Sequence, residues 1–391
     1  MTRRSEGKLS VVPPPRGGRE RDPLPIAERI GADASRTGRG VVAAFIDSGF
    51  FDHPDLVTPF SRIHAYYDVI QEKSGVEHIH KPEVSSWHGM MSTVVAAGNG
   101  ALSGGRFKSL APEMGLVLVK AGTLQRVHHD DIARAIEWVL VNRARFDIRI
   151  LNISCGGDYE VSHLHDPLSR FAEACVRAGI VVVCAVGNSG HRPGYVVPPA
   201  SVPCVISVGG IDDEGNPEIG RIMAYRSSYG PTIDGVQKPE IVTLADWIPA
   251  PILPETPTSK QARLLRRLEL AKDDELSPII AEHRGVFPAL DEAKDRQPYL
   301  LRQIVNAGLH DEKVIDEHYK MVDGTSFSAP IVSSVVAQML EANPALTPSL
   351  VKRILLRTAR RVPHIEVDRQ GWGTLQPKAA VEAALALRAG R

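Results

Sequence analysis

Residues 41–49 read Val-Val-Ala-Ala-Phe-Ile-Asp-Ser-Gly. An unbroken apolar run that ends in Asp and Gly is typical of a strand buried on both faces of a parallel sheet. Apolar runs of this kind alternate with helical patterns along the chain, and this alternation predicts an α/β fold with a doubly wound, mainly parallel sheet flanked by helices. Asp47 then lies at the carboxyl end of a strand, where such sheets place ligands and catalytic groups. Similar apolar runs recur at residues 116–119, 148–153, 180–186 and 205–208, with helical patterns between them at about 130–142 and 168–177.

Two further segments carry candidate catalytic side chains. Trp87-His88-Gly89-Met90 opens a helix of small residues, and Gly324-Thr325-Ser326-Phe327-Ser328-Ala329-Pro330 opens another. Taken alone, Asp47, His88 and Ser326 each have an ordinary interpretation: a turn aspartate, a structural histidine and a helix N-cap serine. Taken together, Asp47, His88 and Ser326 are the three side chains of a nucleophilic triad, in the chain order Asp, His, Ser, with gaps of 41 and 238 residues. This order differs from that of chymotrypsin and of the α/β-hydrolases.

These segments resemble the three active-site signatures of the subtilisin-like serine peptidases. The matching motifs are Asp47-Ser48-Gly49 followed by residues 53–56 (HPDL), His88-Gly89, and residues 324–330. The resemblance covers about residues 27–250 and 318–385. Two positions depart from the family pattern: Met90 stands where Thr is usual, and Phe327 where Met is usual. The resemblance implies that Asp47, His88 and Ser326 form the catalytic triad.

The same resemblance implies a substrate-binding site for an extended peptide. Residues 152–157 resemble the strand that pairs with the substrate backbone and forms one wall of the S1 pocket, which assigns Ser154, Cys155 and Gly156 to substrate binding. Residues 185–190 resemble the opposite wall, which assigns Ala185, Val186 and Gly187 to substrate binding and Asn188 to the oxyanion hole. The expected partners are protein or peptide substrates.

Composition and charge narrow the functional classes. The 46 basic and 46 acidic residues leave no net charge, which argues against nucleic acid or an anionic membrane as a partner. The four cysteines lie in one apolar stretch and are expected to be buried, reduced thiols. We expect no cofactor and no metal, because the loop around Asn99 lacks the carboxylates that calcium prefers. The sequence carries no prediction of oligomeric state.

The amino-terminal segment favours a cytoplasmic protein. It is basic but lacks the apolar region of a signal peptide. Only 46 residues precede Asp47, which are too few for the family's usual folding propeptide. In this respect the sequence resembles the intracellular members of the family. We therefore expect a flexible tail over residues 1–26 and a peptidase domain over residues 27–391.

The peptidase domain is expected to contain a charged helical insertion at residues 251–317. Within residues 255–320, 24 of 66 residues are charged, which predicts a solvent-facing segment. Residues 251–257 are expected to form a stiff connector. Helices are expected from a cap at Ser259, from Ser277-Pro278 to a stop at Gly285, and from Pro298 to Gly308. We expect the insertion to lie beside the cleft and restrict access, or else to be a structural or oligomerisation module.

The predicted function is that of a serine endopeptidase acting through an acyl-enzyme. One alternative is a degenerate member of the family that binds peptides without cleaving them. Another is an α/β hydrolase that acts on esters, but the order Asp47, His88, Ser326 argues against it.

Overall fold

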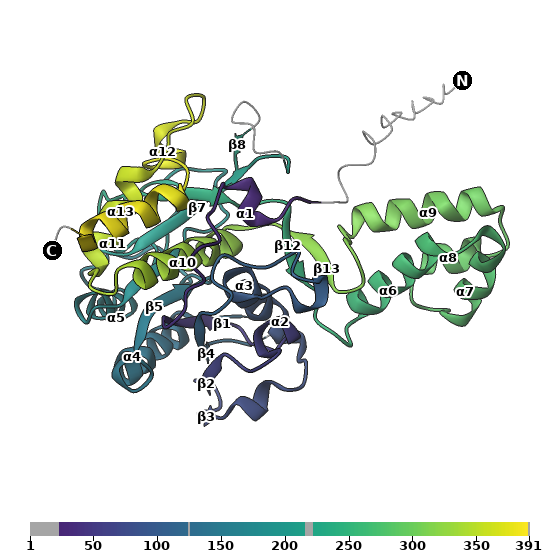
Figure 1. The fold of residues 1–391 in the computed structure, drawn as a ribbon, viewed down its shortest axis with the longest axis horizontal. Helices are drawn as coiled ribbons and strands as arrows, with labels where there is room; N and C mark the ends of the chain where they lie inside the picture. Colours follow the sequence, from purple (N-terminus) through teal and green to yellow (C-terminus); the bar gives the residue numbers. More distant parts are fainter. Residues whose placement is uncertain (1–22, 124–125, 216–221, 390–391) are drawn as a thin grey trace, which may run out of the picture.

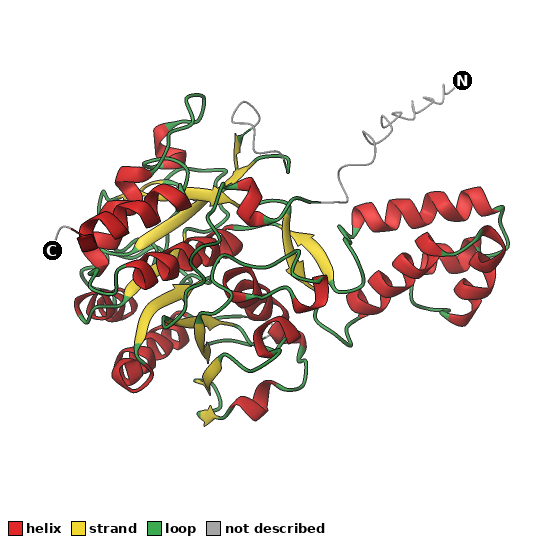
Figure 2. Cartoon of the chain, in the orientation of Figure 1, coloured by secondary structure: helices red, strands yellow, loops and turns green. Residues whose placement is uncertain are grey.

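The computed structural model describes residues 23–123, 126–215 and 222–389, and its centre is a nine-stranded sheet (Figures 1 and 2). The strand order is β11-β7-β6-β5-β1-β4-β2-β3, with β8 paired to β7. Only the two pairings that involve β3 and β8 are antiparallel, so the predicted mainly parallel sheet is confirmed. Its strands are β1 Val42–Asp47, β2 Ile63–Asp68, β3 Lys73–Ser74, β4 Gly115–Lys120, β5 Ile148–Ile153, β6 Val181–Ala185, β7 Ile206–Asp212, β8 Met223–Ala224 and β11 Ile241–Leu244.

Helices cover both faces of this sheet (Figure 1). Strand β1 shows why both faces are apolar: Ala43 and Phe45 lie in one core, and the alternate residues Ala44 and Ile46 lie in the other. The first core is closed by α3 and α10, and the second by α4 and α5. The helices are α1 Ile26–Arg29, α2 Pro54–Val57, α3 Trp87–Ala97, α4 His129–Phe146, α5 Pro167–Arg177, α10 Thr325–Ala342, α11 Pro348–Thr358, α12 Val367–Gln370 and α13 Pro377–Ala389.

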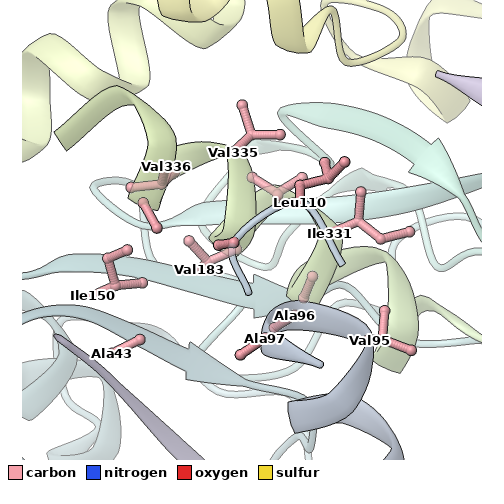
Figure 3. Close-up of a cluster of buried hydrophobic side chains, with 14 of the residues drawn as sticks. Ala43, Val95, Ala96, Ala97, Leu110, Ile150, Val183, Ile331, Val335 and Val336 are labelled. Atoms are coloured by element: carbon pink, nitrogen blue, oxygen red, sulfur yellow. The ribbon is translucent and has the colours of Figure 1, made fainter. Parts of the chain in front are cut away.

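The core between the sheet and α10 fixes the position of the active-site helices. Figure 3 shows Ile150 and Val183 of the sheet facing Ile331 and Val335 of α10, with the small residues of α3 beside them. All four of these side chains are at most 1% exposed. Because close-packed cores resist shifts in their members, the amino-terminal ends of α3 and α10 are held rigidly relative to β1.

The predicted insertion is a separate helical module. Helices α6 Pro257–Leu270, α7 Leu276–Glu282, α8 Pro288–Ala293 and α9 Pro298–Asp311 enclose their own apolar core and project away from the sheet (Figure 1). They are attached through an antiparallel ribbon of β12 Ile248–Pro251 and β13 Tyr319–Val322. A second two-stranded ribbon joins β9 Gly230–Pro231 to β10 Gln237–Lys238. Whether the insertion restricts access stays a prediction.

Several details predicted for the insertion are wrong. Thr256 caps α6, not Ser259, because Pro257 then occupies the first helical position. Helix α7 begins at Leu276 and ends at Glu282, and Ser277 bonds the Lys294 carbonyl instead of capping. Helix α9 begins at Pro298 as expected but runs past Gly308, whose missing side chain lets Leu265 and Phe287 pack closely. Pro251 belongs to β12, not to a connector.

Outside the insertion, two further expectations need correction or qualification. Ile26 is buried and begins α1, so the folded part starts earlier than the predicted residue 27, and residues 1–22 of the predicted tail lie outside the described residues. All four cysteines are free, but only Cys175 and Cys184 are fully buried; Cys155 and Cys204 are partly exposed. Within the described ranges, no helix is both long and apolar enough to cross a membrane.

Candidate active site

Asp47 and His88 form a hydrogen-bonded pair at the carboxyl end of β1. Nδ1 of His88 lies 2.7 and 2.9 Å from the two carboxylate oxygens of Asp47. The carboxylate also accepts hydrogen bonds from the Ser48 amide at 2.7 Å and from the Ser92 hydroxyl at 3.2 Å. The Asp47 side chain is 2% exposed and that of His88 is 20% exposed, so the imidazole is open to a substrate while its partner is not.

The environment raises the pKa of His88. Burial alone would lower the pKa of this imidazole, but the charge and the hydrogen bond of Asp47 outweigh the effect of burial. Since Nδ1 is occupied by the carboxylate, Nε2 is the nitrogen left to exchange a proton with another group. Trp87 stands edge-on to the ring at 5.2 Å and is 43% exposed, so it forms part of the rim beside His88.

Ser326 lies in the first turn of α10 and contacts Ser154, which follows β5 by one residue. Its hydroxyl donates to the Ser154 carbonyl oxygen at 3.1 Å, and the Ser154 hydroxyl donates to the Ser326 carbonyl oxygen at 2.8 Å. The ring of the next residue, Phe327, is 5.8 Å from the His88 ring. Gly324, with φ at 133°, allows the sharp entry into the helix, whose first N–H groups lack intrahelical partners.

Asn188 reaches the same helix start from the turn after β6. Its side-chain oxygen accepts from the amide and the hydroxyl of Thr325, both at 3.0 Å. Because Thr325 takes the oxygen, the NH₂ group faces the other way, 3.6 Å from the position that a Cβ on Gly324 would occupy. The structure therefore pairs Asp47 with His88, sets Asn188 against the residue before Ser326, and joins the two groups through Ser154, which contacts Ser326 and lines a pocket with His88.

The predicted substrate wall borders a pocket of about 300 Å³ beside the Asp47–His88 pair. Ser154 and Cys155 line it together with Asp47 and His88. Gly156 follows beyond the end of β5, which stops at Ile153, so the predicted substrate-binding strand over residues 152–157 is only partly a strand; a Cβ on Gly156 would lie 2.9 Å from the Val197 side chain. Of the opposite wall, Gly187 donates its amide to the Thr325 hydroxyl, while Ala185 and Val186 are buried in the two cores.

Two contributors to the site went unpredicted. Ser92, which holds Asp47, lies one helical turn after His88, so the spacing of four residues was a usable signal. Arg126 lines the pocket from a hairpin after β4, and it pairs with Asp158, 32 residues away. No local pattern links these two residues. Asn99, the one position considered for calcium, uses its side chain to bond Thr58 and Ala101.

Solved structures of similar shape define the class of fold. The CspB protease of Clostridium perfringens matches with a TM-score of 0.64 and 14% identity, over 90% of this chain and 94% of that one. Fervidolysin from Fervidobacterium pennivorans, a keratinolytic enzyme related to subtilisin, matches with a TM-score of 0.62 and 19% identity, over 91% of this chain and 45% of that one. The fold is therefore subtilisin-like, as predicted.

Sequence comparison then gives the family. The model of the subtilase family matches residues 38–373, and the chain belongs to this family. Serine protease AprX of Bacillus subtilis (strain 168) is 29% identical over 334 residues, which make up 82% of this chain and 61% of AprX. The chain thus spans about three fifths of the length of that curated relative. The family predicted from the three active-site motifs is therefore confirmed.

Proposed function

We propose that this protein is a serine endopeptidase in which Asp47, His88 and Ser326 form the catalytic triad. The observation that carries the proposal is the hydrogen bonding in which Nδ1 of His88 faces both carboxylate oxygens of Asp47. This contact fixes the tautomer and leaves Nε2 as the proton acceptor. A peptidase triad also needs a serine nucleophile, and Ser326, the second residue of α10, is the proposed one.

The proposed reaction begins when the Ser326 hydroxyl turns from Ser154 to His88. His88 takes the hydroxyl proton as Ser326 Oγ attacks the scissile carbonyl carbon, and it later gives the proton to the leaving amine. Asp47 stabilises the imidazolium throughout. Water then attacks the acyl-enzyme, with His88 as the base again, and releases the second product.

The oxyanion is stabilised by Asn188 and by the amino-terminal end of α10. Thr325 orients the Asn188 amide, so its NH₂ group is set before the reaction and needs no reorganisation as charge develops. The Ser326 amide and the positive end of the helix dipole add to the same stabilisation. Residues 154–156 and Gly187 would hold the substrate, with Ala185 and Val186 backing that wall from the two cores, and proteins or peptides would be its substrates.

The subcellular location of the protein stays a prediction. We propose the cytoplasm, on the ground that four free thiols, one of them lining the pocket, are retained without a disulfide. No observation favours the ester-hydrolase alternative. The peptide-binding alternative is separated from the enzyme by experiment.

The test is labelling with a serine-reactive fluorophosphonate, followed by hydrolysis of a peptide amide. Wild type should be labelled and active, and Ser326→Ala should lose both while remaining folded. Ser334→Ala is the matched control, because this buried serine of the same helix bonds only the Ile331 carbonyl and should leave both readouts unchanged. A wild-type protein that binds peptides but is neither labelled nor active would establish the non-cleaving alternative.

A further inference from the structure

The end of β11 and the turn after it present four consecutive carbonyl oxygens, those of residues 244–247, to two separate parts of the chain. The first two oxygens hold the start of α10. The Ser328 hydroxyl donates to the first of them and the Gly324 amide to the second, both at 2.8 Å. These two donors stand two residues to either side of Ser326. The carbonyl oxygens therefore fix the helix start that carries the proposed nucleophile.

Arg29, the last residue of α1, binds the other two oxygens. Its Nη2 donates to the Asp246 carbonyl oxygen at 2.9 Å and its Nη1 to the Trp247 carbonyl oxygen at 2.5 Å. The same guanidinium donates through Nε and Nη2 to the two carboxylate oxygens of Asp213, which directly follows β7. The side chain of Arg29 is 0% exposed and that of Asp213 is 2% exposed. The charge is thus buried and paired, and charge-assisted hydrogen bonds of this kind are the strong ones.

The turn between α10 and Arg29 has a backbone conformation that needs support. Trp247 has φ at 55°, in the left-handed region that is unfavourable for a bulky side chain. Such a conformation persists only where the surrounding contacts hold it. Its amide donates to the Asp246 carboxylate at 2.8 Å, and its carbonyl oxygen accepts from Arg29. Without the guanidinium we expect the turn to relax and to shift the two carbonyl oxygens that precede it.

We infer that Arg29 is a positioning residue for Ser326, acting through residues 244–247. The inference rests on the proposed function of Ser326. Arg29 touches no reacting atom; it holds the turn, and the turn holds the amide and the hydroxyl on either side of the nucleophile. The role needs arginine, because one planar fork must serve a carboxylate and two carbonyl oxygens at once. The ammonium of a lysine is a single point of attachment and cannot reach all of them.

The experiment compares wild type with Arg29→Lys, which keeps a positive charge for Asp213 and removes the fork. A 1 Å misplacement of a catalytic group costs about 10²-fold in rate, and lysine keeps part of the contact, so kcat for a short peptide should fall by about tenfold. KM should stay within about twofold, because a displaced nucleophile weakens the transition state and not the binding of the ground state. Urea unfolding of each variant establishes that it is fully folded in the assay.

A matched control separates positioning from a general loss of stability. Arg302 of α9 also binds carbonyl oxygens, three of them at the end of α6, together with the carboxylate of Asp273, but it does so inside the insertion. Arg302→Lys should lower stability and leave kcat unchanged. If Arg29→Lys does not fold, Asp213→Asn takes its place, since it removes the charge that fixes the guanidinium; kcat should again fall at constant KM.

Hydrogen exchange of the segment 322–328 gives a measurement that does not depend on cleavage. Because the Gly324 amide is bonded to the Ala245 carbonyl oxygen, its exchange should become about tenfold faster in Arg29→Lys and stay unchanged in Arg302→Lys. This measurement also works on a wild-type chain that proves inactive. Faster exchange in such a chain would leave the role of Arg29 in place and count against the peptidase proposal alone.

Three results would overturn the inference. The first is an unchanged kcat in the folded variant of an active enzyme. The second is an equal loss of kcat in Arg302→Lys, which would make the effect one of overall stability. The third is unchanged hydrogen exchange of the segment 322–328, because the start of α10 would then not depend on Arg29.

Discussion

Gly89 offers a sharp test of how the fold positions His88. Gly89 follows the histidine on α3, which packs against the end of β1. A Cβ at this position would lie 2.1 Å from the Gly49 carbonyl oxygen, 2.9 Å from the Phe50 ring and 3.0 Å from Cβ of Asp47. Ordinary contact begins at 3.4 Å, so Gly89→Ala must move α3 away from β1 by about 1 Å.

The size of the effect follows from that displacement. Overpacking of a close-packed core costs about 1–3 kcal/mol, so the free energy of unfolding should fall by that amount. The shift also moves His88 relative to Asp47 and Ser326, and a 1 Å misplacement of a catalytic group can cost about 10²-fold in rate. We therefore expect kcat/KM for a short peptide to fall by about two orders of magnitude in a protein that still folds.

The assay combines urea unfolding with peptide hydrolysis at a temperature where the variant is fully folded. Thr93→Ala is the matched control, because this buried side chain of α3 bonds only carbonyl oxygens of its own helix. It should cost some stability and leave kcat/KM within about twofold of wild type. A folded Gly89→Ala protein with kcat/KM within threefold of wild type would refute the reasoning.

Four further predictions follow from the structure. Wild-type kcat/KM should decrease as the pH is lowered, with a midpoint above 6.5, because only neutral His88 acts as a base and Asp47 raises its pKa. Asp47→Asn should lower this midpoint and reduce the rate by about 10⁴-fold. An unmoved midpoint would contradict the assignment. Asn188→Ala should lower kcat by about 10²–10³-fold with little change in KM, whereas a pure KM effect would assign it to ground-state binding. Burial lowers the pKa of His53 to about 4, so between pH 6.5 and 4 the unfolded chain binds a proton that the folded chain does not; stability should decline over that window, and His53→Asn should flatten the decline in urea unfolding. Replacing residues 253–317 with a two-residue turn should leave a folded protein, because β12 and β13 already pair antiparallel and the turn would join their ends. If the insertion restricts access, the cleavage of casein should rise relative to that of a tetrapeptide. An unchanged ratio would exclude this role.

The sheet could be predicted from the sequence because its signal is local. A strand buried on both faces is apolar over most of its length, so runs such as residues 116–119 stand out; β4 contains these residues and one more at each end. Strand β12 was missed for the opposite reason. Its sequence, Ile-Pro-Ala-Pro, excludes a central strand, but one edge of a two-stranded ribbon needs few amide donors.

The helix starts in the insertion show the limit of capping signals. Thr256 and Ser259 are both good caps, and only the Pro after Thr256 favours the first. The end of α9 was misplaced because Gly308 ends helices in many proteins, whereas here it gives Leu265 and Phe287 room to pack. That packing joins residues more than 40 positions apart for Leu265, which no local pattern reports.

By itself, the sequence determined the positions of strands β1, β4, β5, β6 and β7, the short motifs around Asp47, His88, Asn188 and Ser326, and hence the family. Each of these depends on residues close together in the chain. Only the tertiary structure decided that both Asp47 oxygens face His88, that Thr325 turns the Asn188 amide, and that Arg126 pairs with Asp158. These contacts depend on how the sheet brings distant loops to one edge, and the free energy that selects them comes from the packing of the two cores on either side of the sheet.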